Sequence, residues 1–257
     1  MLAQRTSSTR SDRPALRGFP HVFLLLLLAL ATLPGCKSTQ VRQVEDAAGK
    51  PLVVHGSVVL VEPDIELYAV GAGGMNEPRK AWTETARRNF PEAARQRLQA
   101  AGFTLQPDFY LPKDAGPESR LRQIYLLNQA VSISILNYGR EGALRNKHGR
   151  FDWTLGPGVQ ALQEATGADY ALFTYVRDSY TSGGRAAMRV IGFLLLGGDI
   201  GGGVQMGLAS LVDLRTGQVV WHNLLLDQTG DLRDPNGARE TADDLLRGLN
   251  ARRGDAP

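Results

Sequence analysis

Hydrophobic and polar residues follow two different periods along the chain. Runs rich in apolar and β-branched residues predict strands over 52–61, 65–71, 103–106, 168–176, 204–212 and 218–226. A period near 3.6 residues predicts helices over 79–101, 118–138, 159–165 and 239–253. Because strands and helices are interspersed, the pattern predicts one mixed α/β (α+β) domain over 51–253. Its mixed sheet should contain about five strands flanked by helices.

Two details sharpen this prediction. Pro91 lies inside the helical pattern of 79–101, which indicates either one kinked helix or two short ones. The segment Asp213–Gly217 separates two strand patterns and ends on a glycine, which tolerates positive φ. The last two predicted strands should therefore form a β-hairpin.

The amino-terminal pattern is different. A basic stretch with Arg5, Arg10, Arg13 and Arg17 precedes twelve mainly apolar residues, 22–33. Twelve residues of helix span about 18 Å, which is too short for a hydrocarbon core of about 30 Å. The pattern is typical of a secretory signal peptide over residues 1–35, with the small residue Gly35 just before the cleavage site.

The chain contains one cysteine, Cys36, directly after this segment. A single cysteine cannot form an intrachain disulfide, and four scattered histidines make a zinc site improbable. The sequence Leu-Pro-Gly-Cys over 33–36 resembles the lipobox of bacterial lipoproteins. The resemblance implies cleavage between Gly35 and Cys36 and acylation of Cys36, which would attach the protein to a lipid bilayer. The alternative is an ordinary secretory signal that happens to end at a cysteine.

The residues after Cys36 refine this expectation. The second residue of the mature protein would be Lys37 rather than Asp, which in Gram-negative lipoproteins implies an outer-membrane location, here on the periplasmic face. Residues 37–50 are polar and lack a helix or strand period. We therefore expect residues 36–50 to be a lipidated, flexible tether.

Removing the signal peptide also changes the charge balance. The chain has 29 Lys and Arg against 26 Asp and Glu, but residues 1–35 hold four Arg and one Asp. The remaining chain has 25 residues of each sign and is formally neutral. Net charge therefore gives no reason to expect nucleic-acid binding.

Several motifs occur in order along the mature chain. Ala-x-Gly-Phe ends a predicted helix near residue 103, Thr-Gly-Ala-Asp-Tyr-Ala-Leu-Phe leads into the strand at 168, and Ala-Ser-Leu-Val-Asp-Leu-Arg-Thr-Gly-Gln-Val-Val-Trp forms the hairpin. Together they are similar to periplasmic lipoproteins with a CsgG-like or TolB amino-terminal-like domain, over about residues 64–252. The resemblance implies an accessory role in envelope assembly, transport or secretion.

Residues 183–203 form a glycine-rich insertion relative to that pattern and contain an apolar run. They match neither a dinucleotide-binding fingerprint nor a phosphate-binding P-loop, so no cofactor is predicted. One interpretation is a crossover helix over 185–196 packed on the sheet. The other is a mobile apolar element that contacts the membrane or neighbouring protomers through Val190, Ile191, Phe193, Leu194 and Leu195.

Candidate catalytic residues do not assemble into a motif. His148 with nearby Asp152 could form a base and its orienting carboxylate, but a solvated loop is the simpler interpretation. His222 is expected to be an exposed or half-buried strand residue, His55 has no ligand-spaced partners, and Asp243 and Asp244 should face water. The three tryptophans are expected as core or rim anchors, and the basic loop 140–150 as a solvated surface.

We therefore expect a non-catalytic lipoprotein with neither a metal site nor a catalytic site, which binds other envelope proteins. The alternatives are a homo-oligomeric subunit of an outer-membrane secretion pore and an envelope hydrolase.

Overall fold

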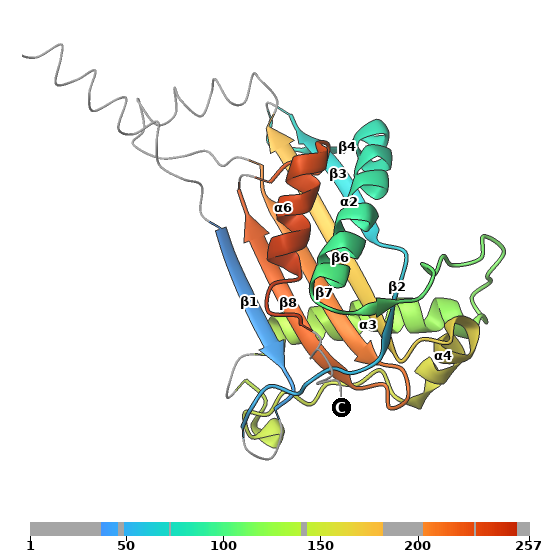
Figure 1. The fold of residues 1–257 in the computed structure, drawn as a ribbon. Helices are drawn as coiled ribbons and strands as arrows, with labels where there is room; N and C mark the ends of the chain where they lie inside the picture. Colours follow the sequence, from blue (N-terminus) through green and yellow to red (C-terminus); the bar gives the residue numbers. More distant parts are fainter. Residues whose placement is uncertain are drawn as a thin grey trace, which may run out of the picture. The chain divides into compact units, whose positions relative to one another are not determined.

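The computed structural model describes residues 37–45, 49–71, 73–139, 143–181, 203–228 and 230–250. In this part of the chain eight strands form one sheet, and helices lie on both of its faces (Figure 1). The strands are β1 (Lys37–Gln43), β2 (Ser57–Leu60), β3 (Asp64–Val70), β4 (Asn76–Pro78), β5 (Thr104–Leu105), β6 (Tyr170–Thr181), β7 (Gln205–Asp213) and β8 (Val219–Asp227). The helices are α2 (Lys80–Ala100), α3 (Arg120–Tyr138), α4 (Gln160–Thr166) and α6 (Pro235–Leu245), with 3-10 turns η1 (Arg145–Lys147) and η2 (Pro157–Val159).

The sheet is mixed, which confirms the predicted fold class, although it has eight strands rather than about five. Its order is β1-β8-β7-β6-β2-β5, antiparallel from β1 to β6 and parallel from β6 to β5. β3 continues the line of β2 along β6, because Leu60 lies opposite Leu172 and Asp64 lies opposite Tyr175. Pro63 has no N–H to donate, which explains the break between the two strands.

Two amino-terminal segments differ from the prediction. The strand expected over 52–61 is confined to β2, and Leu52 and Val53 are exposed. Residues 37–43, expected in a flexible tether, form β1 and pair with β8 over their whole length. Val41 is the only large apolar residue of β1, so the sequence carries no strand period there. Backbone pairing with β8 supplies the order instead.

One face of the sheet is covered by α2 and α6, which lie side by side in Figure 1. α2 is a single helix with Pro91 buried inside it, which decides between the two arrangements that the sequence left open. The core on this face includes Phe90, Leu98, Trp221, Leu225 and Leu245. Full burial of such side chains stabilises the fold by roughly 1.5–3 kcal/mol each.

α6 begins four residues earlier than predicted and ends at Leu245 rather than at 253. The Asp234 side chain accepts hydrogen bonds from the backbone N–H groups of Asn236 (2.8 Å) and Gly237 (3.4 Å). Pro235 occupies the first helical position, where its missing N–H is not needed. Asp-Pro is thus the true start signal of this helix.

The opposite face is covered by α3 and α4, and α3 crosses behind the strands in Figure 1. The core on this face includes Ile124, Ile135, Leu162, Phe173 and Val212. The β7–β8 hairpin is confirmed: Gly217 has φ of 79°, and the Asp213 side chain accepts from Arg215 N (2.8 Å) and Thr216 N (3.2 Å). No helix in the described ranges is long and apolar enough to cross a membrane.

Candidate functional site

Four polar residues form a row across one end of the sheet, which we call the polar row. Lys37 of β1 lies opposite Asp227 of β8, which lies opposite Gln205 of β7, which lies opposite Asp178 of β6. Residues directly opposite one another project to the same face, so all four side chains point toward α6. Asp227, Gln205 and Asp178 are each at most 2% exposed. Such burial of polar groups requires partners.

At the β1 end of the row, a lysine joins two acidic residues. The Lys37 Nζ lies 2.6 Å from Asp244 Oδ2 and 3.3 Å from Asp227 Oδ2. The hydrogen bond to Asp244 raises the pKa of Lys37. Asp244 is 7% exposed, so the expectation that it faces water is wrong, whereas the neighbouring Asp243 is exposed. The contact attaches α6 to the first residue of β1.

At the β6 end, an amide bridges α6 to an aspartate. Gln205 accepts from Thr241 Oγ1 (3.0 Å) and donates through Nε2 to Asp178 Oδ2 (2.8 Å). Tyr180 also donates its hydroxyl to Asp178 and accepts from the backbone N–H of Leu232 (2.9 Å). Burial raises the pKa of Asp178 to about 6, and the two donors oppose this shift. Burial also raises the pKa of Tyr180, so its hydroxyl remains protonated.

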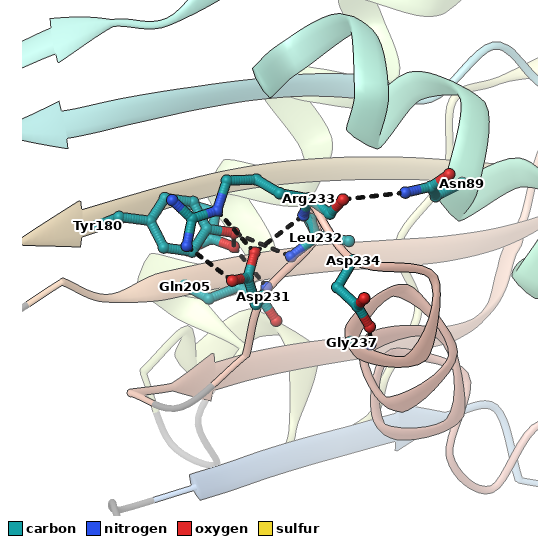
Figure 2. A network of polar contacts seen from close by, with 9 residues as sticks. Asn89, Tyr180, Gln205, Asp231, Leu232, Arg233, Asp234 and Gly237 are labelled. Carbon is teal, nitrogen blue, oxygen red and sulfur yellow. Dashed lines mark hydrogen bonds and ion pairs between the residues drawn. The ribbon is translucent and has the colours of Figure 1, made fainter. Parts of the chain in front are cut away.

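The segment before α6 is held against this end of the sheet by an arginine, as Figure 2 shows. The Arg233 guanidinium forms an ion pair with Asp231 (2.7 Å) and stacks on Tyr180, with 3.8 Å from Cζ to the ring centroid. It also lies 4.8 Å from the ring centroid of Trp82. Asn89 of α2 donates to the Arg233 carbonyl (3.4 Å). These contacts join β6, α2 and the segment before α6 around one residue, Arg233.

A hollow of about 220 Å³ opens beside the polar row and is lined in part by Asp178, Gln205, Asp227 and Asp231. Carboxylate and amide oxygens dominate these walls, so the hollow can accept hydrogen bonds and positive charge. In the part of the chain that the structure describes, no group of three His, Cys, Asp or Glu side chains is placed to hold a metal ion.

The predicted lipid-attachment and cleavage residues, Cys36 and Gly35, lie outside the described residues. The same holds for the predicted crossover helix 185–196 and for the predicted contact residues Val190, Ile191, Phe193, Leu194 and Leu195. Their described neighbours in sequence are informative, however. Lys37 follows Cys36, and Thr181 and Gly203 line the hollow and flank 182–202. Cys36 and the segment 182–202 are therefore both joined in sequence to described residues at the same end of the sheet.

The candidate base His148 is not oriented by Asp152. Asp152 instead forms an ion pair with Lys147 (2.6 Å), which also lies 4.4 Å from the ring centroid of Trp153. His148 is exposed and has a left-handed backbone with φ of 50°. His55 is also exposed. This geometry gives no support to a His148–Asp152 pair.

His222 is fully buried at 2% exposed, so the expectation of an exposed or half-buried residue is wrong. Its Nδ1 lies 2.9 Å from Ser210 Oγ, which in turn lies 3.0 Å from Ser132 Oγ on α3. Burial lowers the pKa of His222 to about 4, so the ring is neutral near pH 7. It joins α3 to the sheet through a short chain of hydrogen bonds.

The polar row was missed in the sequence because each of its members is an ordinary polar residue in its own strand. A signal did exist. Gln205 begins a strand, Asp227 ends one, and Asp178 is a carboxylate near the end of a third. Only the register between strands places these residues side by side, and the register is not visible in one strand's pattern.

No protein-family model and no curated protein sequence matches the chain. Among solved structures, it is similar to PelC of Paraburkholderia phytofirmans, described as a dodecamer, with a TM-score of 0.37 and 18% identity over 84% of this chain and 100% of that one. A single-substitution variant of the same dodecamer gives a TM-score of 0.40 and 17% identity with the same coverage.

Proposed function

We propose that the protein is a lipoprotein of the bacterial envelope, anchored through acylated Cys36 and acting by binding other envelope proteins. The location would be the periplasmic face of the outer membrane, as Lys37 implies. The polar row and its hollow would then lie next to the bilayer, and the opposite end of the sheet would face the periplasm.

One observation carries this proposal: β1 begins at Lys37, the residue directly after Cys36. A lipid on Cys36 would be separated from the folded domain by no linker. Lys37 is fixed in two ways. Its backbone pairs with β8, and its side chain forms ion pairs with Asp244 and Asp227. Acylation would therefore restrict the orientation of the domain as well as its location.

The binding role is supported by the surface of α3. Large apolar residues of this helix are exposed to solvent, by 50% at Leu126, 43% at Leu127, 51% at Ile133, 37% at Leu136 and 53% at Tyr138. Helical spacing places Leu126, Ile133 and Leu136 on one side of the helix. A contiguous exposed apolar patch of this kind is typical of an interaction surface.

Replacement of the acylated cysteine tests the anchor. Cys36→Ser should abolish incorporation of a fatty-acid label and leave the 1–35 segment attached, because the thiol is needed for both acylation and cleavage. Lys37→Ala is the matched control at the next position and should be acylated and cleaved normally. The measurements are metabolic labelling, the mass of the mature amino terminus, and membrane fractionation. Normal cleavage and membrane attachment of Cys36→Ser would show that the proposal is wrong.

A further inference from the structure

A second cavity lies on the other face of the sheet, between α3 and strands β6 and β7. Its volume is about 370 Å³, within the range of about 300–1,000 Å³ that ligand sites occupy. Tyr125 and Asn128 reach it from α3, Phe173 and Tyr175 from β6, and Leu208 from β7. The cavity lies on the opposite face of the sheet from the polar row, whose side chains point to the α6 face.

One polar atom in this wall has no partner. Asn128 is 8% exposed, and its Oδ1 accepts no hydrogen bond from the described residues. A buried acceptor without a donor costs free energy, so such atoms are rare unless a ligand or water completes them. The other unpartnered oxygen near the cavity belongs to Thr174. Strand alternation turns that side chain to the opposite face from Phe173 and Tyr175.

The charged neighbours of Asn128 are already paired. Asp64 binds Arg177 Nη1 (2.9 Å) and accepts from Gln129 (2.8 Å), and the Arg177 guanidinium stacks on Tyr175, with 3.9 Å from Cζ to the ring centroid. Burial raises the pKa of Tyr125, so its phenol is neutral. The described side chains of the cavity therefore leave no charge unpaired, and Asn128 Oδ1 is a fully buried acceptor in this wall that lacks a donor.

The remaining walls favour a flat, apolar occupant. Tyr125, Phe173 and Tyr175 present aromatic rings, which pack well against a further aromatic ring. Met206 adds a thioether, which also makes favourable contacts with aromatic groups. Water alone is a poor occupant, because the apolar side chains of the wall offer it no hydrogen bond.

We propose that this cavity binds a neutral aromatic side chain of a partner protein, tryptophan or tyrosine, whose N–H or O–H donates to Asn128 Oδ1. The partner is a protein rather than a free small molecule because Ile133 and Leu136, on the cavity rim, are exposed by 51% and 37%. A polypeptide that places one ring in the cavity would also cover these two residues. This inference rests on the proposed binding function and specifies the chemistry of the partner.

The test compares two nearly isosteric probes, indole and benzofuran, which differ in the N–H donor. The mature lipoprotein in lipid nanodiscs is titrated with each probe, and methyl resonances of Met206 and Leu208 report occupancy of the cavity. Indole should bind about three- to tenfold more tightly than benzofuran, the factor expected for one net hydrogen bond. Empty nanodiscs give the correction for probe dissolved in lipid.

Two variants of α3 distinguish the effect of the Asn128 acceptor from that of the exposed surface of the helix. Asn128→Leu should remove the preference for indole while leaving benzofuran binding in place, and Asn137→Ala, on an exposed polar position of α3 that does not line the cavity, should leave both affinities unchanged. The probe comparison in the unmodified protein does not depend on whether Asn128→Leu folds. Equal affinity for the two probes, or no shift of the cavity methyl groups, would overturn the proposal.

A third probe distinguishes the source of the ring. N-acetyltryptophanamide carries the peptide groups of a polypeptide and should compete with indole at the same methyl resonances. Binding of indole without binding of the capped tryptophan would overturn the assignment to a protein side chain. All of these measurements report the cavity directly, so they can fail while acylation of Cys36 is confirmed. If acylation fails, the same titrations are made on the unacylated protein in buffer, where the preference for indole is still expected.

Discussion

Asp178 and His222 are buried on opposite faces of the sheet and titrate with opposite consequences for stability. An unfolded aspartate titrates near 3.9, whereas burial raises the pKa of Asp178 to about 6. Its contribution to the free energy of unfolding is full below pH 4 and is lost as pH rises through 6. Burial lowers the pKa of His222 from 6.5 to about 4. Its contribution is full above pH 6.5 and is lost as pH falls through 4.

These opposite signs lead to a prediction for single variants. When the pH falls from 7 to 4, the free energy of unfolding of Asp178→Asn should decrease by roughly 2–3 kcal/mol relative to that of the unmodified protein. In this variant the stability lost at His222 is no longer offset by the stability gained at Asp178. His222→Asn should gain a similar amount over the same range. Urea unfolding at pH 7, 6, 5 and 4, followed by circular dichroism, measures both changes. Parallel pH profiles for all three proteins would contradict the assigned burial effects.

At the scale of single elements, β1 depends on its partners more than on its own sequence. Lys37→Met removes the positive charge that lies between Asp244 and Asp227, whose side chains are 10% and 3% exposed. We expect faster amide hydrogen exchange across 37–43 and a loss of about 1–3 kcal/mol of unfolding free energy, since a buried charged group loses a partner. Exchange measured by mass spectrometry on peptides covering β1 and β8 checks this.

Arg42→Met is the matched control for that change. It removes a positive charge from the same strand, at a position that alternation places on the opposite face from Lys37. Its effect on exchange in β1 should be smaller. Equal effects of the two substitutions would mean that the lysine contact does not hold the strand.

The elements also show what a sequence can and cannot reveal. The β7–β8 hairpin was predictable because strand patterns flank a turn that ends on Gly217, and α3 was predictable from its long helical period. β1 was not, because a polar edge strand is ordered by its neighbour. The Ser132–Ser210–His222 chain was hidden for a related reason: hydrogen bonds between elements depend on how a helix sits on the sheet. The polar row depends in the same way on strand register.

At the scale of the whole domain, the two ends of the sheet are far apart. β7 has nine residues, so about 27 Å separates the polar row from the start of the β7–β8 turn. Met75, in the turn between β3 and β4, lies beyond the polar row at the same end of the sheet, because Val70 pairs with both Asn76 and Thr181. Met75 is 77% exposed, and the side chain of Arg215, in the opposite turn, is 79% exposed.

If Cys36 carries the lipid and β1 begins at the next residue, a probe at Met75 should lie much closer to the bilayer than a probe at Arg215. Met75→Cys and Arg215→Cys each introduce one thiol, since acylation blocks Cys36, and a fluorophore on each can be quenched by spin-labelled lipids. We expect strong quenching at position 75 and little at position 215, with vesicles free of spin label as the control. Equal quenching at both sites would mean that the domain moves freely on its lipid, and stronger quenching at 215 would reverse the proposed orientation. Either outcome would be compatible with acylation of Cys36, because the lipid fixes only one end of β1. The orientation is inferred separately, from the lack of a linker between Cys36 and β1.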